Sequence, residues 1–150
     1  MIRIFLLTLF LSFNLTAENS IEALEETLYK FWEARNNQDF EMIFFYESKI
    51  GAITGSSSEN YFYEDPPPDL KSVVDYYSLV ESDVKPSNVK IIQLSEKVYL
   101  TLYYLTGSYK YSNGKVNTEY KTRASNIWFY EDGGFKLYYK NFTNLKKELE

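Results

Sequence analysis

The first long apolar pattern in the chain has the period of a helix. Its apolar side chains recur at intervals of one, three or four residues and form a single stripe: Ile21, Leu24, Leu28, Phe31 and Trp32. This spacing predicts an amphipathic helix that ends near Arg35 and buries one face. The polar residues 36–38 interrupt the pattern, and Asp39 and Asp69 are each suited to cap a further, shorter helix.

Most of the chain after these helices has the pattern of strands. A short pair is expected at 49–54 and 61–63, before the stiff loop of three prolines at 66–68. Longer strands are expected at 89–94, 98–111, 116–130 and 135–143, with hairpin turns at Asn113-Gly114 and Asp132-Gly133-Gly134. Helices followed by a run of strands indicate an α+β fold. We expect a cone-shaped roll, in which a strongly curved antiparallel sheet packs on three N-terminal helices.

The chain is expected to be one domain behind a cleavable leader. Residues 1–17 combine a basic Arg3, an apolar run at 4–13 and a small Ala17, which is the pattern of a signal peptide. The alternative is a membrane anchor, but the run is well short of the about 20 residues that span a bilayer. We therefore assign 18–145 to a single domain and 146–150 to a charged tail, and expect a periplasmic or secreted protein with no membrane attachment after cleavage.

Composition excludes several kinds of chemistry. The chain has no His and no Cys, so disulfides, thiol nucleophiles and His-based triads are ruled out. Its net charge of −5 argues against nucleic acid as a partner, because phosphate binding needs a basic face. The acidic residues Glu64, Asp65 and Asp69 do not follow the spacing of a calcium loop. We expect no metal and no cofactor.

Three segments carry a resemblance to a known family. They are residues 31–40 (FWEARNNQDF), residues 122–128 (TRASNIW) and residues 132–137 (DGGFKL). In order and spacing they resemble the nuclear transport factor 2-like superfamily, in particular its bacterial SnoaL-like branch. The resemblance implies the cone-shaped fold and, as in many members, a homodimer formed through the sheet. The superfamily includes enzymes, ligand binders and scaffolds, so it does not define the function.

The resemblance does not carry over any catalytic residue. Many relatives bear a His-x-His pair in the final strand, and the corresponding positions here look like Tyr139 and Asn141. The ketosteroid isomerase members use a first-helix Tyr as an oxyanion donor, and Phe31 stands at about that position. We therefore predict no catalytic residue.

Five residues are candidates for holding a ligand in the cone. Arg123 lies in the middle of a predicted strand and could bind a carboxylate or phosphate bidentately. Alternatively it faces solvent, because Lys121 shares its strand face. Tyr103 and Tyr139 could present rings and hydroxyls to a flat apolar ligand, with Asn141 as a polar partner. Trp32 could line the cone or pack in the core.

These observations leave three hypotheses. The first is a non-catalytic domain that binds a small apolar or acidic ligand in its cone. The second is a homodimeric interaction or scaffold module that uses the outer face of the sheet. The third is an acid–base enzyme of the isomerase or lyase type, which would need Tyr103 or Tyr139 within hydrogen-bond reach of a carboxylate.

Overall fold

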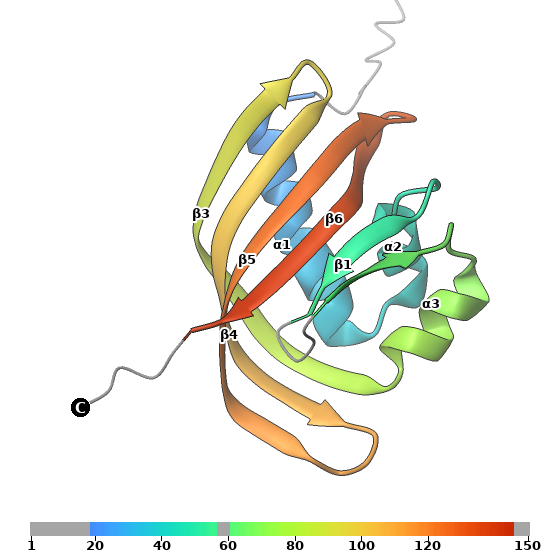
Figure 1. Ribbon diagram of the computed structural model, residues 1–150, viewed down its shortest axis with the longest axis vertical. Helices are drawn as coiled ribbons and strands as arrows, with labels where there is room; N and C mark the ends of the chain where they lie inside the picture. The colour runs from blue at the N-terminus through green and yellow to red at the C-terminus, as the bar shows by residue number, and fades with distance from the viewer. Residues whose placement is uncertain (1–18, 57–60, 146–150) are drawn as a thin grey trace, which may run out of the picture.

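The computed structural model describes residues 19–56 and 61–145 (Figure 1). Three helices come first in the chain and are interrupted by a short strand pair. The helices are α1 (Ile21–Asn37), α2 (Phe40–Tyr46) and α3 (Leu70–Tyr77). The strands are β1 (Ala52–Gly55), β2 (Phe62–Asp65), β3 (Val80–Ser95), β4 (Val98–Tyr111), β5 (Val116–Glu131) and β6 (Gly134–Asn144). The expected signal peptide and the charged tail lie outside the described residues. No helix within these ranges is long and apolar enough to cross a membrane.

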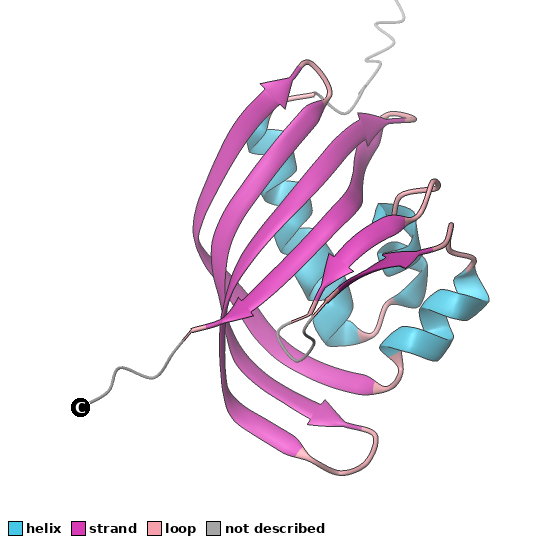
Figure 2. Cartoon of the chain, in the orientation of Figure 1, coloured by secondary structure: helices cyan, strands magenta, loops and turns pink. Residues whose placement is uncertain are grey.

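The six strands form one sheet in the order β2-β1-β6-β5-β4-β3. The last four strands are an antiparallel meander, and their long curved ribbons lie over α1 (Figure 2). The expected α+β architecture, with a curved sheet on three helices, is confirmed. One detail differs from the expected antiparallel sheet: β1 runs parallel to β6, with Ile53 opposite Tyr139. The short β1–β2 hairpin is thereby attached to the edge of the meander.

Polar side chains begin the three helices. The Ser20 hydroxyl accepts a hydrogen bond from the amide of Ala23, and the Asp39 carboxylate accepts one from Met42. Asp69 and Ser72 exchange hydrogen bonds in a reciprocal capping box. These caps satisfy amides that have no partner inside the helix, so each helix start is fixed by local sequence.

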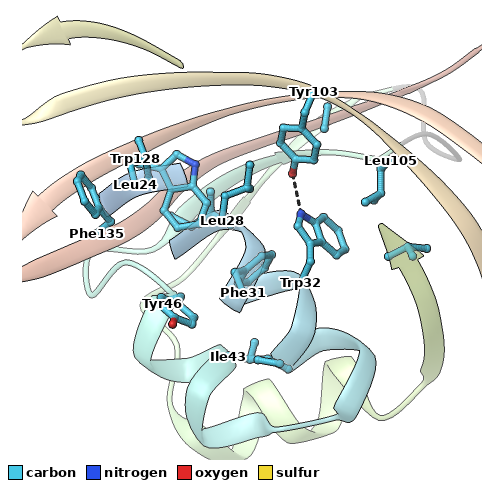
Figure 3. Packing of buried hydrophobic residues seen from close by; sticks show 14 of the residues in the cluster. Leu24, Leu28, Phe31, Trp32, Ile43, Tyr46, Tyr103, Leu105, Trp128 and Phe135 are labelled. Carbon is cyan, nitrogen blue, oxygen red and sulfur yellow. Dashed lines mark hydrogen bonds between the residues drawn. The ribbon is translucent and has the colours of Figure 1, made fainter. Parts of the chain in front are cut away.

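The core lies between α1 and the inner face of the sheet (Figure 3). Leu24, Leu28, Phe31 and Trp32 are all buried, as the apolar stripe predicted. Phe31 meets Trp128 edge to face, with the ring centroids 6.0 Å apart. Such contacts add to the burial of large aromatic side chains and fix the position of α1 against the sheet.

The strand after α3 is longer than the sequence predicted. The helix ends at Tyr77, and β3 begins at Val80 rather than at Val89. Pro86 lies inside β3, opposite Leu105, although a proline has no amide hydrogen to donate to a strand ladder. Because β3 is at the edge of the sheet, a proline can be accommodated there without loss of a central ladder bond.

Candidate functional site

The two faces of the sheet are distinguished by alternation along β4. Thr101, Tyr103 and Leu105 are buried against the helices, whereas Leu102 and Tyr104 face away. The side turned away from α1 is called the outer face below. Residues that are directly paired on neighbouring strands share a face. The strand register therefore assigns each paired residue to either the inner or the outer face.

Three of the five candidate ligand residues lie on the outer face. Arg123 is paired with Tyr104 and Thr143, and it is exposed. Of the two alternatives for Arg123, this is the solvent-facing one, and the reason is the ordinary alternation of an antiparallel strand. Tyr139 is paired with Ile127, and Asn141 with Ser125, on the same face. Arg123 and Asn141 border a shallow outer hollow of about 480 Å³.

The other two candidates meet inside the molecule. The indole Nε1 of Trp32 donates a hydrogen bond of 3.1 Å to the hydroxyl of Tyr103 (Figure 3). Asn126 Nδ2 donates a second hydrogen bond of 2.9 Å to the same hydroxyl. Tyr103 is 3% exposed, and burial raises its pKa well above the usual range. Tyr103 is thus a core residue. Trp32 is the one candidate that also lines an inner cavity.

This inner cavity has a volume of about 270 Å³ and an aromatic wall. It lies between the C-terminal half of α1, α3 and the inner face of the sheet. The aromatic rings that line it come from α1, α3 and four strands: Phe31, Trp32, Tyr63, Tyr76, Tyr77, Tyr109, Tyr111, Tyr120 and Phe142. Arg35 and Lys140 are the cationic side chains in the lining. None of the described residues that line the cavity is Asp or Glu.

Lys140 forms part of a buried ion pair at one side of the cavity. Its Nζ lies 3.2 Å and 3.1 Å from the two carboxylate oxygens of Glu47. The Tyr77 hydroxyl donates a hydrogen bond of 2.5 Å to Glu47 Oε1. The side chains of Lys140 and Glu47 are only 11% and 5% exposed. Burial opposes the charged form of Lys140, but Tyr77 and Glu47 outweigh it, and the pKa of Lys140 is raised.

Arg35 has a different environment at the same cavity. It lies in the last turn of α1, and its Cζ is 3.9 Å from the centroid of the Tyr77 ring. Among the described residues no carboxylate forms a salt bridge with it. Burial raises the pKa of Tyr109, and Arg35 opposes that shift as a nearby charge and hydrogen-bond partner. Within 19–56 and 61–145, the half-buried guanidinium therefore has aromatic contacts and no ion pair.

The sequence carried weak signals for both cations, which were not among the candidates. Arg35 follows Phe31 by four residues and so continues the apolar stripe of α1. Lys140 lies between Tyr138 and Phe142 at a period of two, in a strand that is rich in aromatic residues. Neither signal could distinguish a cavity cation from a surface one, because the strand register was unknown.

A smaller cavity of about 200 Å³ lies on the other side of Lys140 and Tyr77. Glu47 and Asp65 are among its lining residues, and Thr54 Oγ1 donates a hydrogen bond of 2.7 Å to Asp65 Oδ2. Within 19–56 and 61–145 no group of three or more potential ligands could hold a metal ion.

Comparison with known proteins gives relatives in structure alone. No protein-family model matches the chain, and no curated protein matches it. A nuclear transport factor 2-like protein from Cytophaga hutchinsonii superposes with a TM-score of 0.68 at 15% identity, over 85% of this chain and all of that one. A ketosteroid isomerase-like protein from Erwinia carotovora atroseptica gives 0.63 at 12% identity, over 82% of this chain and 94% of that one.

A third solved structure has a different description. It is a proposed calcium/calmodulin-dependent kinase II association domain from Exiguobacterium sibiricum, with a TM-score of 0.66 at 12% identity. The match covers 87% of this chain and 98% of that one. Together these structures show that the chain has the nuclear transport factor 2-like fold, as the three sequence segments indicated. At such low identity they establish the fold and not the activity.

Proposed function

We propose that the protein is a periplasmic or secreted domain that binds a small ligand, with an apolar body and an acidic group, in its inner cavity without catalysing a reaction. The observation that carries this proposal is the Arg35 guanidinium, which lines an aromatic cavity and has no carboxylate partner among the described residues. A charge in such a place is costly unless a counter-charge is supplied. An acidic ligand would supply it.

The geometry of Arg35 suits this role. Its guanidinium is stacked by one face on Tyr77, and a guanidinium carries its five N–H donors in the plane of the group. Stacking therefore leaves the N–H donors that do not contact Tyr109 available for a carboxylate. The surrounding rings make the local environment less polar than water, and a less polar environment strengthens a charge-assisted hydrogen bond.

The acid–base alternative finds less support. Tyr103 donates to no carboxylate and is enclosed in the core, and Tyr139 lies on the outer face. The Tyr–carboxylate pair that does exist is Tyr77 with Glu47, but the Tyr77 proton is already directed at Glu47. Glu47 also holds Lys140 through both oxygens. Neither group is positioned to exchange a proton with a molecule in the cavity without breaking this buried cluster.

The proposal is tested by native mass spectrometry of the mature protein purified from the envelope of its own host. A co-purified small acid is expected on the wild-type protein and on Arg123→Gln, and it should be lost from Arg35→Gln. Arg123 is the matched control because it is an exposed arginine outside the cavity. Equal retention by the two variants would place the ligand elsewhere. A protein with no small molecule, together with no response to added acids, would contradict the proposal.

Self-association through the outer face is a second candidate function. Leu100, Leu102, Ile127 and Tyr139 form a cluster of half-buried apolar side chains there. A partly exposed apolar surface of this kind is typical of a protein interface. Light scattering of the purified protein is the test: a dimer that Ile127→Glu dissociates, while the surface variant Lys110→Glu does not, is the expected result. A wild-type monomer at micromolar concentration would contradict this function.

A further inference from the structure

The two cations of the inner cavity differ in how their charges are balanced. Lys140 has a full counter-charge within the protein, because Glu47 contacts its Nζ through both oxygens. The Oδ2 atom of Asp65 is a second carboxylate oxygen near the same Nζ, at a distance of 3.9 Å. Arg35 has an aromatic ring beneath it and no ion pair with any described residue. Among the residues that the structure describes, the cavity therefore presents one positive charge without a carboxylate partner rather than two.

From this difference we infer that the ligand is a planar, single-ring monocarboxylate, whose carboxylate pairs with Arg35 and whose ring lies against the aromatic wall. The inference rests on the proposed function, since it specifies the ligand of the same cavity. A neutral ligand would leave the half-buried guanidinium without a counter-charge. A dianion would bring a second negative charge beside Lys140, which Glu47 already neutralises.

The volume of the cavity limits the ligand to about one ring. An apolar cavity of about 150 Å³ holds a benzene molecule. The cavity here is about 270 Å³, so it has room for one ring and a carboxyl group. Pockets for drug-sized ligands run from about 300 to 1,000 Å³. A fused multi-ring ligand is therefore not expected to fit without displacement of the lining side chains.

The wall offers both edges and faces to a flat ring. Tyr109 and Tyr120 meet edge to face with centroids 4.5 Å apart, and Trp32 meets Phe142 in the same way at 6.1 Å. An aromatic ligand can continue this edge-to-face arrangement, which aromatic pairs prefer to a direct sandwich. An aliphatic acid of equal volume would lack these contacts.

The chain provides its own reporter for binding in this cavity. It has two tryptophans, of which Trp32 lines the cavity and Trp128 is buried elsewhere in the core. A ligand in the cavity should shift the NMR signal of the Trp32 indole N–H and leave that of Trp128 nearly unchanged. Titrations would use four probes of similar size, namely benzoate, benzamide, benzylammonium and the dianion phthalate.

We expect benzoate to bind at least tenfold more tightly than any of the other three probes. Arg35→Gln should abolish this preference, with the affinity for benzamide unchanged, and Arg123→Gln should behave as the wild-type protein. If Arg35→Gln does not fold, Arg35→Lys keeps the charge without the bidentate edge, and it should lose at least part of the preference.

The outcomes separate this inference from the proposed function. Equal binding of benzamide and benzoate with a shift at Trp32 would overturn the monocarboxylate and leave the cavity as a ligand site. If phthalate binds as tightly as benzoate, the inference that the ligand carries a single negative charge is wrong. If none of the probes shifts the Trp32 signal at millimolar concentration, both the inference and the proposed function are wrong for ligands of this size.

Discussion

The hydroxyl of Tyr103 is the shared acceptor of two buried donors, the indole of Trp32 on α1 and the amide of Asn126 on β5. It joins the first helix to the middle of the sheet beside the cavity. Removal of this oxygen in Tyr103→Phe leaves both donors buried without an acceptor. We expect the free energy of unfolding to fall by about 2–4 kcal/mol. Denaturant unfolding measures it.

The neighbouring tyrosine provides the control for that experiment. Tyr104 is 40% exposed on the outer face, so Tyr104→Phe should change the stability by less than about 0.5 kcal/mol. An equally small effect of Tyr103→Phe would mean that other groups accept the two hydrogen bonds.

The buried pair of Lys140 and Glu47 should be costly to break from one side. Lys140→Met leaves the Glu47 carboxylate enclosed with the Tyr77 hydroxyl as its remaining donor. We expect a loss of about 3–5 kcal/mol, because an uncompensated charge stays buried. The double variant Lys140→Met/Glu47→Gln should recover much of that loss. Thermal and chemical unfolding of the three proteins gives the comparison.

An exposed ion pair of the sheet serves as the reference for this series. Lys110 and Glu81 are more than half exposed, so Lys110→Met should cost less than about 1 kcal/mol. A double variant no more stable than Lys140→Met alone would show that the loss arises from packing rather than from the unpaired carboxylate.

The cap of α3 should contribute a pH-dependent part of the stability. Hydrogen bonds from the Ser72 amide and hydroxyl hold the pKa of Asp69 below its usual range. A carboxyl with a lowered folded-state pKa stabilises the fold above its unfolded pKa, and this contribution is lost as the pH falls through the folded-state value. From neutral pH to about pH 3, the free energy of unfolding of the wild-type protein should thus fall further than that of Asp69→Asn.

The control is Asp83→Asn, because Asp83 is an exposed carboxylate outside any helix cap. Its stability, measured by unfolding at each pH, should follow the wild-type curve. Parallel curves for all three proteins would refute the assignment.

Gly107 lies where β3 and β4 approach each other closely. Its φ is +147°, and a Cβ at this position would lie 2.0 Å from the carbonyl oxygen of Asp83. Gly107→Ala should therefore force the two strands apart and cost about 3 kcal/mol. Gly134→Ala is the matched change, since its Cβ would have ordinary contacts with Phe45. Unfolding curves for both variants test the difference, and similar curves would contradict the steric explanation.

Local sequence accounts for much of the fold. The caps at Asp39 and Asp69 and the turn at Asn113-Gly114 depend on neighbouring residues, so their positions could be predicted. The start of β3 was predicted too late in the chain, because a strand tolerates Pro86 only at the edge of a sheet, and the strand order is a property of the whole sheet.

The site was less predictable for a physical reason. A change of one residue in strand parity exchanges the two faces completely, so the pattern around Arg123 could not say which side faced the helices. Arg35 and Lys140 become neighbours of one cavity only when the end of α1 and β6 are brought together. The counter-charge of Lys140 is Glu47, which is 93 residues away in the sequence, so this pairing could not be predicted from neighbouring residues.

The two edge strands of the sheet are built in a way that opposes polymerisation of the protein. An exposed edge with free amides and carbonyls can recruit a strand from another chain and start an aggregate. Here one edge is β2, which has only four residues. The other edge, β3, contains Pro86 and an irregularity in its pairing between Ser87 and Lys90. A proline removes a donor from the edge, and a bulge twists it, so a further strand would find no continuous ladder on either side.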